Sequence, residues 1–211
     1  KGAAAPVLEA DVYMPTINSI VIKDKAVLAS CDKFETETFT MTLTDNALVS
    51  YVDVTCSTGE VNVSKNAQVT GSAVVTSKMY LNVSNSGQAS FTQNGGNAFI
   101  SQANSAYIDY KATLNMIEVE SSGSSESHIS GTASHLKVTG TGLSRVDAEL
   151  LESKDGDVFI NGSTKCHVNV TEHLKVNLTG GSMLTFKRNP SFEIDRIVNS
   201  TLIKADDAKR K

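Results

Sequence analysis

Alternating apolar residues recur about every 20 residues along most of this 211-residue chain. One apolar anchor can be chosen in each of ten copies, with spacings of 17 to 22 residues: Ile22, Leu43, Val63, Val83, Ile100, Val119, Val138, Ile160, Leu178 and Val198. The residue two positions before the anchor is apolar in nine copies, and the residue after it is always polar. This alternation indicates a short strand with one buried face in every copy.

A single copy of this length cannot bury its apolar face, whereas stacked copies share a continuous core. Small residues tend to follow four positions after the anchor, as at Ala47 and Ala67, and they indicate a tight corner. The repeat therefore predicts an all-β, single-stranded, right-handed parallel β-helix of about ten turns with a mean period near 20 residues. We expect a leader and N-terminal cap at residues 1–20, the β-helix at 21–203 and a charged tail at 204–211.

Other repeat architectures fit less well. A left-handed β-helix has a regular 18-residue turn, whereas the copies here vary in length. Leucine-rich repeats need an L-x-x-L-x-L pattern, which the chain lacks. A β-propeller needs about 40 residues per blade, so odd and even copies would have to differ systematically. They do not.

Composition limits the possible partners. The formal net charge is −4, from 19 Lys and Arg against 23 Asp and Glu, which argues against a nucleic-acid binder with a strongly basic face. No apolar run reaches the roughly 20 residues of a membrane-spanning helix. Cys31, Cys56 and Cys166 are predicted to be buried small hydrophobes, with one bridged pair as the alternative. Because the first residue is Lys1, we expect that a signal peptide has been removed.

Several residues that could bind metal have simpler interpretations. Asp155-Gly156-Asp157 lacks the rest of a calcium-binding loop and is predicted to be a β-turn. Cys166 and His167 are adjacent, so in a strand they point to opposite faces. His135 and His173 lie two predicted turns apart, about 9.6 Å, which is too far to share a zinc ion. We therefore expect no metal or cofactor site.

Two carboxylate pairs could in principle cleave a polysaccharide. Glu118 and Glu120 are predicted to share one outer face, and Asp147 and Glu149 to share another. The chain has no Trp, and the nearest tyrosines in sequence lie elsewhere, so we expect no aromatic platform beside either pair. The pairs are therefore predicted to be solvated surface charges, and no catalytic residue is assigned. The polar residue after each anchor could contact glycans, but we favour a ladder that satisfies corner backbone groups.

The last third of the chain carries motifs of a known family. They are Leu136–Glu149 (LKVTGTGLSRVDAE), Leu174–Ser182 (LKVNLTGGS) and Arg188-Asn189-Pro190. These motifs resemble the head GIN domain family of Gram-negative bacteria, whose members are labelled autotransporter adhesins. They depart from the family pattern because its S-G-S-G runs are eroded, for example to Thr139–Gly142, and because Arg188 replaces a glycine. The resemblance implies a right-handed β-helix that is exported to the envelope, and it supplies no catalytic residues.

These observations support three hypotheses. The first is a non-enzymatic, exported or cell-surface β-helix that acts as an adhesion or binding module, with a surface glycan or a host or matrix protein as partner. The second is a bactofilin-like structural protein that polymerises end to end. The third is a polysaccharide-active β-helix enzyme, which would need acidic and basic residues clustered across successive turns.

Overall fold

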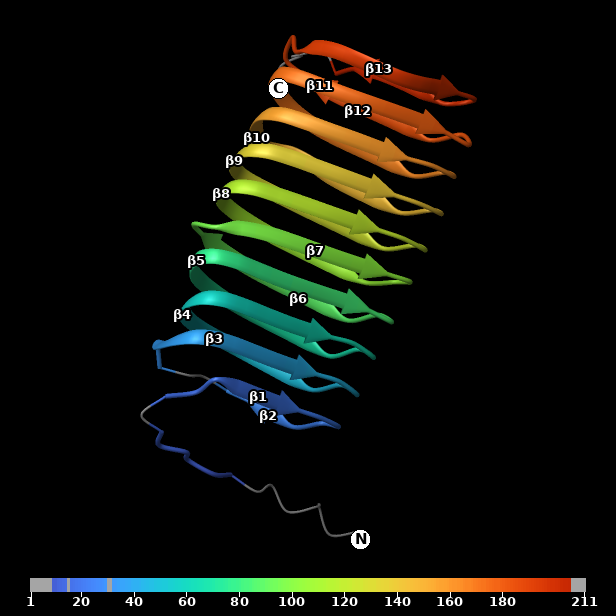
Figure 1. Cartoon of the computed structure of the whole chain (residues 1–211). Coiled ribbons are helices and arrows are strands. Elements are labelled where there is room, and N and C mark those ends of the chain that lie inside the picture. Colours follow the sequence, from blue (N-terminus) through green and yellow to red (C-terminus); the bar gives the residue numbers. More distant parts are fainter. Residues whose placement is uncertain (1–8, 15, 30–31, 206–211) are drawn as a thin grey trace, which may run out of the picture.

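The chain winds into a stack of parallel β-strands, as a computed structural model that describes residues 9–14, 16–29 and 32–205 shows (Figure 1). All pairings among the described strands are parallel. The strands are β1 (Ser19–Ile22), β2 (Val27–Leu28), β3 (Phe34–Leu43), β4 (Leu48–Val63), β5 (Gln68–Ser84), β6 (Gln88–Asn94), β7 (Asn97–Ala103), β8 (Tyr107–Ser121), β9 (Glu126–Gly140), β10 (Arg145–Ile160), β11 (Lys165–Thr179), β12 (Met183–Lys187), β13 (Ser191–Val198) and β14 (Thr201–Lys204). The predicted all-β parallel solenoid is confirmed. Its right-handed winding and the division at residues 20 and 203 stay predictions.

Each turn contributes to two faces of the solenoid. β5 shows the arrangement, because its first part pairs with β6 and its second part pairs with β7. We call the face formed by β1, β7, β13 and the segments that pair with them the front face; it includes residues 58–63, 78–84, 116–121, 135–140, 155–160 and 173–179. The back face holds β2, β6, β12, β14 and the first parts of the long strands.

The alternation within each strand sends one set of side chains into a shared core. Leu43, Val63 and Val83 stack on successive turns, and each is at most 1% exposed. Cys56 and Cys166 are buried with free thiols, as predicted, and Cys31 lies outside the described residues. The core therefore runs along the axis of the stack, and the outward side chains of both faces remain available for contacts.

The predicted register is wrong by two residues in the middle turns. Val83 pairs with Gln102, whereas the predicted anchor Ile100 pairs with Leu81. Val119 and Val138 continue the stack above Ile100. The anchor column itself is polar or small in these turns, with Gln102, Ser121 and Gly140. The apolar anchors of these turns therefore lie in the neighbouring buried column, and this shift explains the outlying spacings of 17 and 22 residues.

The same shift misplaced the corner residues. The buried small residues of the middle turns are Ala106, Ser125 and Ser144, and the predicted Asn104, Gly123 and Gly142 lie two positions earlier. Asn104, Gly123 and Gly142 have φ values between 63° and 77°, a left-handed conformation that Gly and Asn adopt most readily. At the last turn the predicted anchor Val198 is also shifted, because Leu178 pairs with Ile197.

Several buried polar side chains of the middle turns form hydrogen bonds with one another, although the side-chain oxygen of Gln102 has no partner among the described residues. The side-chain amide nitrogen of Gln102 donates to the hydroxyls of Ser121 (2.9 Å) and Ser127 (3.0 Å). Ser121 and Ser125 share a further hydrogen bond of 3.0 Å. Buried polar groups are tolerated when they are hydrogen-bonded, so the mostly apolar core accommodates these side chains along with other buried polar residues such as Gln93 and Thr164.

Candidate functional site

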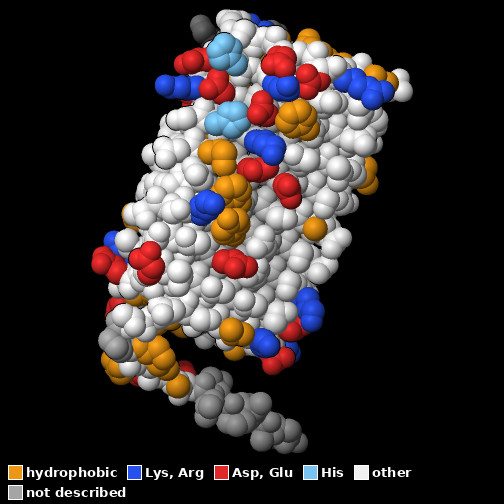
Figure 2. All heavy atoms as spheres, viewed as in Figure 1, with side chains coloured by type: hydrophobic (Ala, Val, Ile, Leu, Met, Phe, Trp, Pro, Cys, Tyr) orange, Lys and Arg blue, Asp and Glu red, His pale blue; other side chains and the backbone are white. Residues whose placement is uncertain are grey.

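The front face carries a column of outward side chains that runs along the solenoid axis. Register pairs connect its members on successive turns: Glu60, Tyr80, Phe99, Glu118, Lys137, Asp157, Lys175 and Glu193. These residues alternate with buried ones such as Leu81 and Ile117. Figure 2 shows this face, with hydrophobic side chains near mid-height and acidic, basic and histidine side chains toward the C-terminal end.

Tyr80 and Phe99 form an aromatic pair in the N-terminal half of this column. Their ring centroids lie 5.1 Å apart and the ring planes differ by 19°. Phe99 pairs in turn with Glu118 on the next strand. The expectation that no aromatic group accompanies the Glu118–Glu120 pair is therefore wrong. The predicted register aligned Phe99 with Asn82, and this two-residue error separated the two rings.

A shallow groove of about 380 Å³ surrounds this aromatic pair. Glu118 accepts a hydrogen bond of 2.5 Å from the Lys137 ammonium, and this bond raises the pKa of Lys137. Glu120 has no ion pair with any described residue. The groove thus combines apolar ring surface with amide, hydroxyl and carboxylate groups; its lining is Tyr80, Asn82, Phe99, Ile100, Ser101, Glu118 and Glu120.

A second groove of about 410 Å³ lies on the same face toward the C-terminal end. His135 and His173 both line it, one turn on either side of Asp155, so their predicted two-turn separation is confirmed. The ring Nε2 of His135 lies 3.1 Å from a carboxylate oxygen of Asp157. The β-turn predicted at Asp155-Gly156-Asp157 is wrong, because all three residues lie inside β10. Gly156 occupies a buried strand position, where its missing side chain leaves room for its neighbours.

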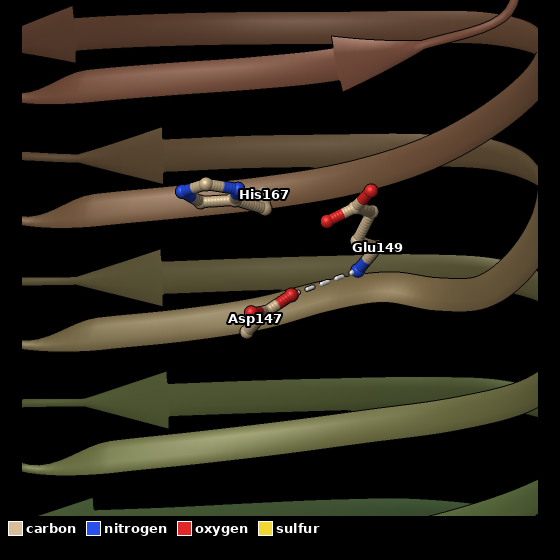
Figure 3. Close-up of side chains that lie close together, drawn as sticks. All are labelled: Asp147, Glu149 and His167. Carbon is tan, nitrogen blue, oxygen red and sulfur yellow. Dashed lines mark hydrogen bonds between the residues drawn. The ribbon is translucent and has the colours of Figure 1, made fainter. Parts of the chain in front are cut away.

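The back face carries the other predicted acidic pair. Asp147, Glu149 and the imidazole of His167 have donor atoms within 4.8 Å of one another (Figure 3). The backbone amide of Glu149 donates to Asp147 at 3.3 Å. Basic groups already compensate the two charges, because Arg145 lies 3.5 Å from Asp147 and Lys187 lies 2.7 Å from Glu149. This cluster is therefore a balanced ion-pair network.

The predicted orientations of Cys166 and His167 are confirmed. Cys166 is fully buried in the core, and His167 lies beside the acidic pair on the outer surface. Burial raises the pKa of the Cys166 thiol. The thiol therefore stays protonated at neutral pH, whereas a metal ligand would have to be a thiolate.

The chain was compared with known protein families, curated proteins and solved structures. The family model described as "Putative auto-transporter adhesin, head GIN domain" matches residues 43–190, which is more than half of the chain. No curated protein and no solved structure gives a significant match. Within the described residues, no helix is long and apolar enough to cross a membrane. From the extent of the family match, the chain belongs to the head GIN domain family.

Proposed function

We propose that this protein is a non-catalytic binding module, exported to the bacterial envelope, that uses its front face to hold an extended glycan. The observation that carries the proposal is that the two grooves, of about 380 and 410 Å³, lie on one face along the solenoid axis. An extended chain laid along the axis could contact both grooves. The family description as an adhesin is consistent with this role.

The chemistry of the first groove favours a neutral or amino-sugar glycan. Sugars offer apolar C–H patches as well as hydroxyl groups, and sites that combine aromatic surface with a few polar groups suit both. Tyr80 and Phe99 supply the apolar strip, and Asn82 supplies an amide. Glu120 adds a carboxylate without a basic partner among the described residues, which disfavours acidic polysaccharides.

A glycan array probed with the full chain tests this proposal. We expect binding to neutral or amino-sugar polymers that the double variant Tyr80→Ser/Phe99→Ser loses. Tyr107→Ser is the matched control, because Tyr107 is a half-exposed aromatic residue on the back face, 40% exposed. Glu120→Lys, a surface change, provides a second front-face variant, and far-UV circular dichroism checks that each variant folds.

Two results would overturn the proposal. Equal loss of binding in the front-face variants and in Tyr107→Ser would mean that the front face has no special role. Release of reducing ends or unsaturated sugars from a bound polysaccharide would show an enzyme instead. Export is tested separately by fractionating cells that express the precursor, since recovery in the cytoplasm would contradict an envelope location.

One observation favours end-to-end association as a second candidate function. Among the described strands, β13 pairs only with β11, and no further turn of the described chain covers its apolar side chains. Phe192 is 41% exposed and Ile194 is 55% exposed. An open apolar strand edge is a template for pairing with another chain. Sedimentation velocity would then detect assemblies that Ile194→Asp disrupts, and a monomer at all concentrations would reject this candidate.

A further inference from the structure

We propose that Asp155, Glu172 and His173 form a binding site for a divalent transition-metal ion such as Zn²⁺. One donor atom from each of these residues lies within 4.8 Å of the other two. Asp155 and His173 also line the 410 Å³ groove of the front face. This site does not depend on the proposed glycan binding.

An irregularity in strand pairing brings the donors together. Consecutive residues of a regular strand point to opposite faces, so Glu172 and His173 would not normally converge. β11 carries one residue more than β10 just before the Asp155–His173 pair, and Glu172 lies in this bulge. Bulges of this kind redirect a side chain, which accounts for the proximity of both donors to Asp155.

One oxygen of the Asp155 carboxylate is buried without a hydrogen-bond partner. Its Oδ1 atom exposes less than 1 Å² and has no hydrogen bond. A buried oxygen without a partner is costly, and a cation beside it would remove that cost. Lys154, the neighbour of Asp155 in β10, makes no ion pair with it among the described residues.

The charges of the site are also uncompensated, in contrast to those on the back face. Asp155 and Glu172 form no ion pair with a described Lys or Arg, whereas Asp147 and Glu149 each have one. Two carboxylates held together without an ion-paired Lys or Arg repel each other. A divalent cation would neutralise both, so the front cluster is the better candidate of the two.

A hydrogen-bond chain orients the imidazole of His173. The hydroxyl of Ser191 donates its single proton to the backbone carbonyl of Glu172 at 3.1 Å. The same hydroxyl is hydrogen-bonded to Nδ1 of His173, so Nδ1 donates to it, and the neutral ring then offers Nε2 to a metal. Histidines that bind metals are typically oriented by such a bond from their other ring nitrogen.

The donor set selects the class of metal. One imidazole and two carboxylates suit Zn²⁺ or Mn²⁺, whereas Ca²⁺ and Mg²⁺ prefer oxygen ligands alone. Three protein ligands leave at least one position for water or for a group from a partner. A metal here would therefore sit in the groove on the face that we propose for binding.

Isothermal titration calorimetry of the untagged chain with ZnCl₂ tests the site. We expect one Zn²⁺ per chain, and an affinity lower by about tenfold or more in His173→Ala and in Glu172→Gln. Both positions are exposed, so the variants should fold, and circular dichroism checks this. The matched control is His167→Ala, which removes the corresponding imidazole of the back-face cluster and should bind Zn²⁺ as the wild type does.

The thermal unfolding midpoint gives a second readout. Zn²⁺ should raise it for the wild type and for His167→Ala but not for His173→Ala, because a ligand stabilises only the folded state that binds it. The proposal is overturned if the wild type binds no Zn²⁺ or Mn²⁺ at millimolar concentration. It is also overturned if His173→Ala binds as tightly as the wild type, or if His167→Ala alone abolishes binding.

Discussion

Replacing Gly131 with alanine should destabilise the solenoid more than any other single methyl added at a glycine. Gly131 lies in β9 between its partners Ala112 and Leu151 on the adjacent turns. Its φ of +111° is a conformation that residues with side chains rarely adopt. A Cβ at this position would lie 1.9 Å from the carbonyl oxygen of Ala112, so the backbone itself would have to move.

Two costs set the size of the effect. Holding alanine at a strained positive φ costs about 1–3 kcal/mol. Moving the strand away from the Ala112 carbonyl leaves a buried acceptor poorly paired, which costs about 1–3 kcal/mol more. We therefore expect Gly131→Ala to lower the free energy of unfolding by about 2–6 kcal/mol, a large fraction of a typical domain's stability of about 5–15 kcal/mol.

Urea denaturation followed by circular dichroism measures this loss, with Gly156→Ala as the matched control. Gly156 also lies in a strand, but the atoms nearest to its added Cβ all belong to side chains, a methyl of Val170 at 2.7 Å and one of Leu174 at 3.3 Å. A side chain can shift, so the control should lose about 1–3 kcal/mol, as for ordinary overpacking. The reasoning is refuted if Gly131→Ala loses no more stability than Gly156→Ala.

Three further predictions concern hydrogen bonds and charge. Tyr110→Phe removes the donor to the buried Oε1 of Gln93 and should cost about 1–3 kcal/mol in urea denaturation at pH 7; a loss below about 0.5 kcal/mol would contradict this. Burial raises the pKa of the Tyr110 phenol. The stability gained by burying the neutral phenol is therefore complete below about 10, the pKa of tyrosine in the unfolded chain, and it is lost as the pH rises above that value. Between pH 9 and 11 the urea midpoint of the wild type should therefore fall further than that of Tyr110→Phe, which keeps the same buried thiols; parallel curves would exclude this role. Lys137→Met removes the partner of Glu118 on a solvent-accessible face and should change thermal stability by less than about 1 kcal/mol, whereas a loss above about 2 kcal/mol would show that the pair is structural.

The sequence was sufficient to predict the type of fold because the apolar alternation has one physical interpretation. A copy of about 20 residues with one buried face must stack, and the parallel pairing of Val63 with Val83 follows from that requirement. The prediction of strand register failed in the turns where the buried column becomes polar. At Gln102 and Ser121 the hydrogen bonds that make burial possible come from neighbouring turns, and residue type alone does not reveal them.

The candidate sites were harder to predict for the same reason. Tyr80 and Phe99 are 19 residues apart, and a two-residue error in register is enough to hide their contact. Glu172 lies close to Asp155 only because of a bulge. No sequence pattern predicts one extra residue in a strand. Long-range register and local irregularity therefore limit the prediction of functional sites more than they limit the prediction of the fold.

The register that assembles the front face can be tested directly by disulfide formation between adjacent turns. The structure pairs Asn82 with Ser101, and paired positions of neighbouring strands, about 4.8 Å apart, suit a disulfide. In a chain with its three native cysteines replaced by alanine, Asn82→Cys with Ser101→Cys should oxidise nearly completely, as mass spectrometry after thiol alkylation would report. Ser84→Cys with Ser101→Cys, the pair expected if Val83 stacked on Ile100, should stay reduced. Efficient oxidation of the second pair and not the first would contradict the account.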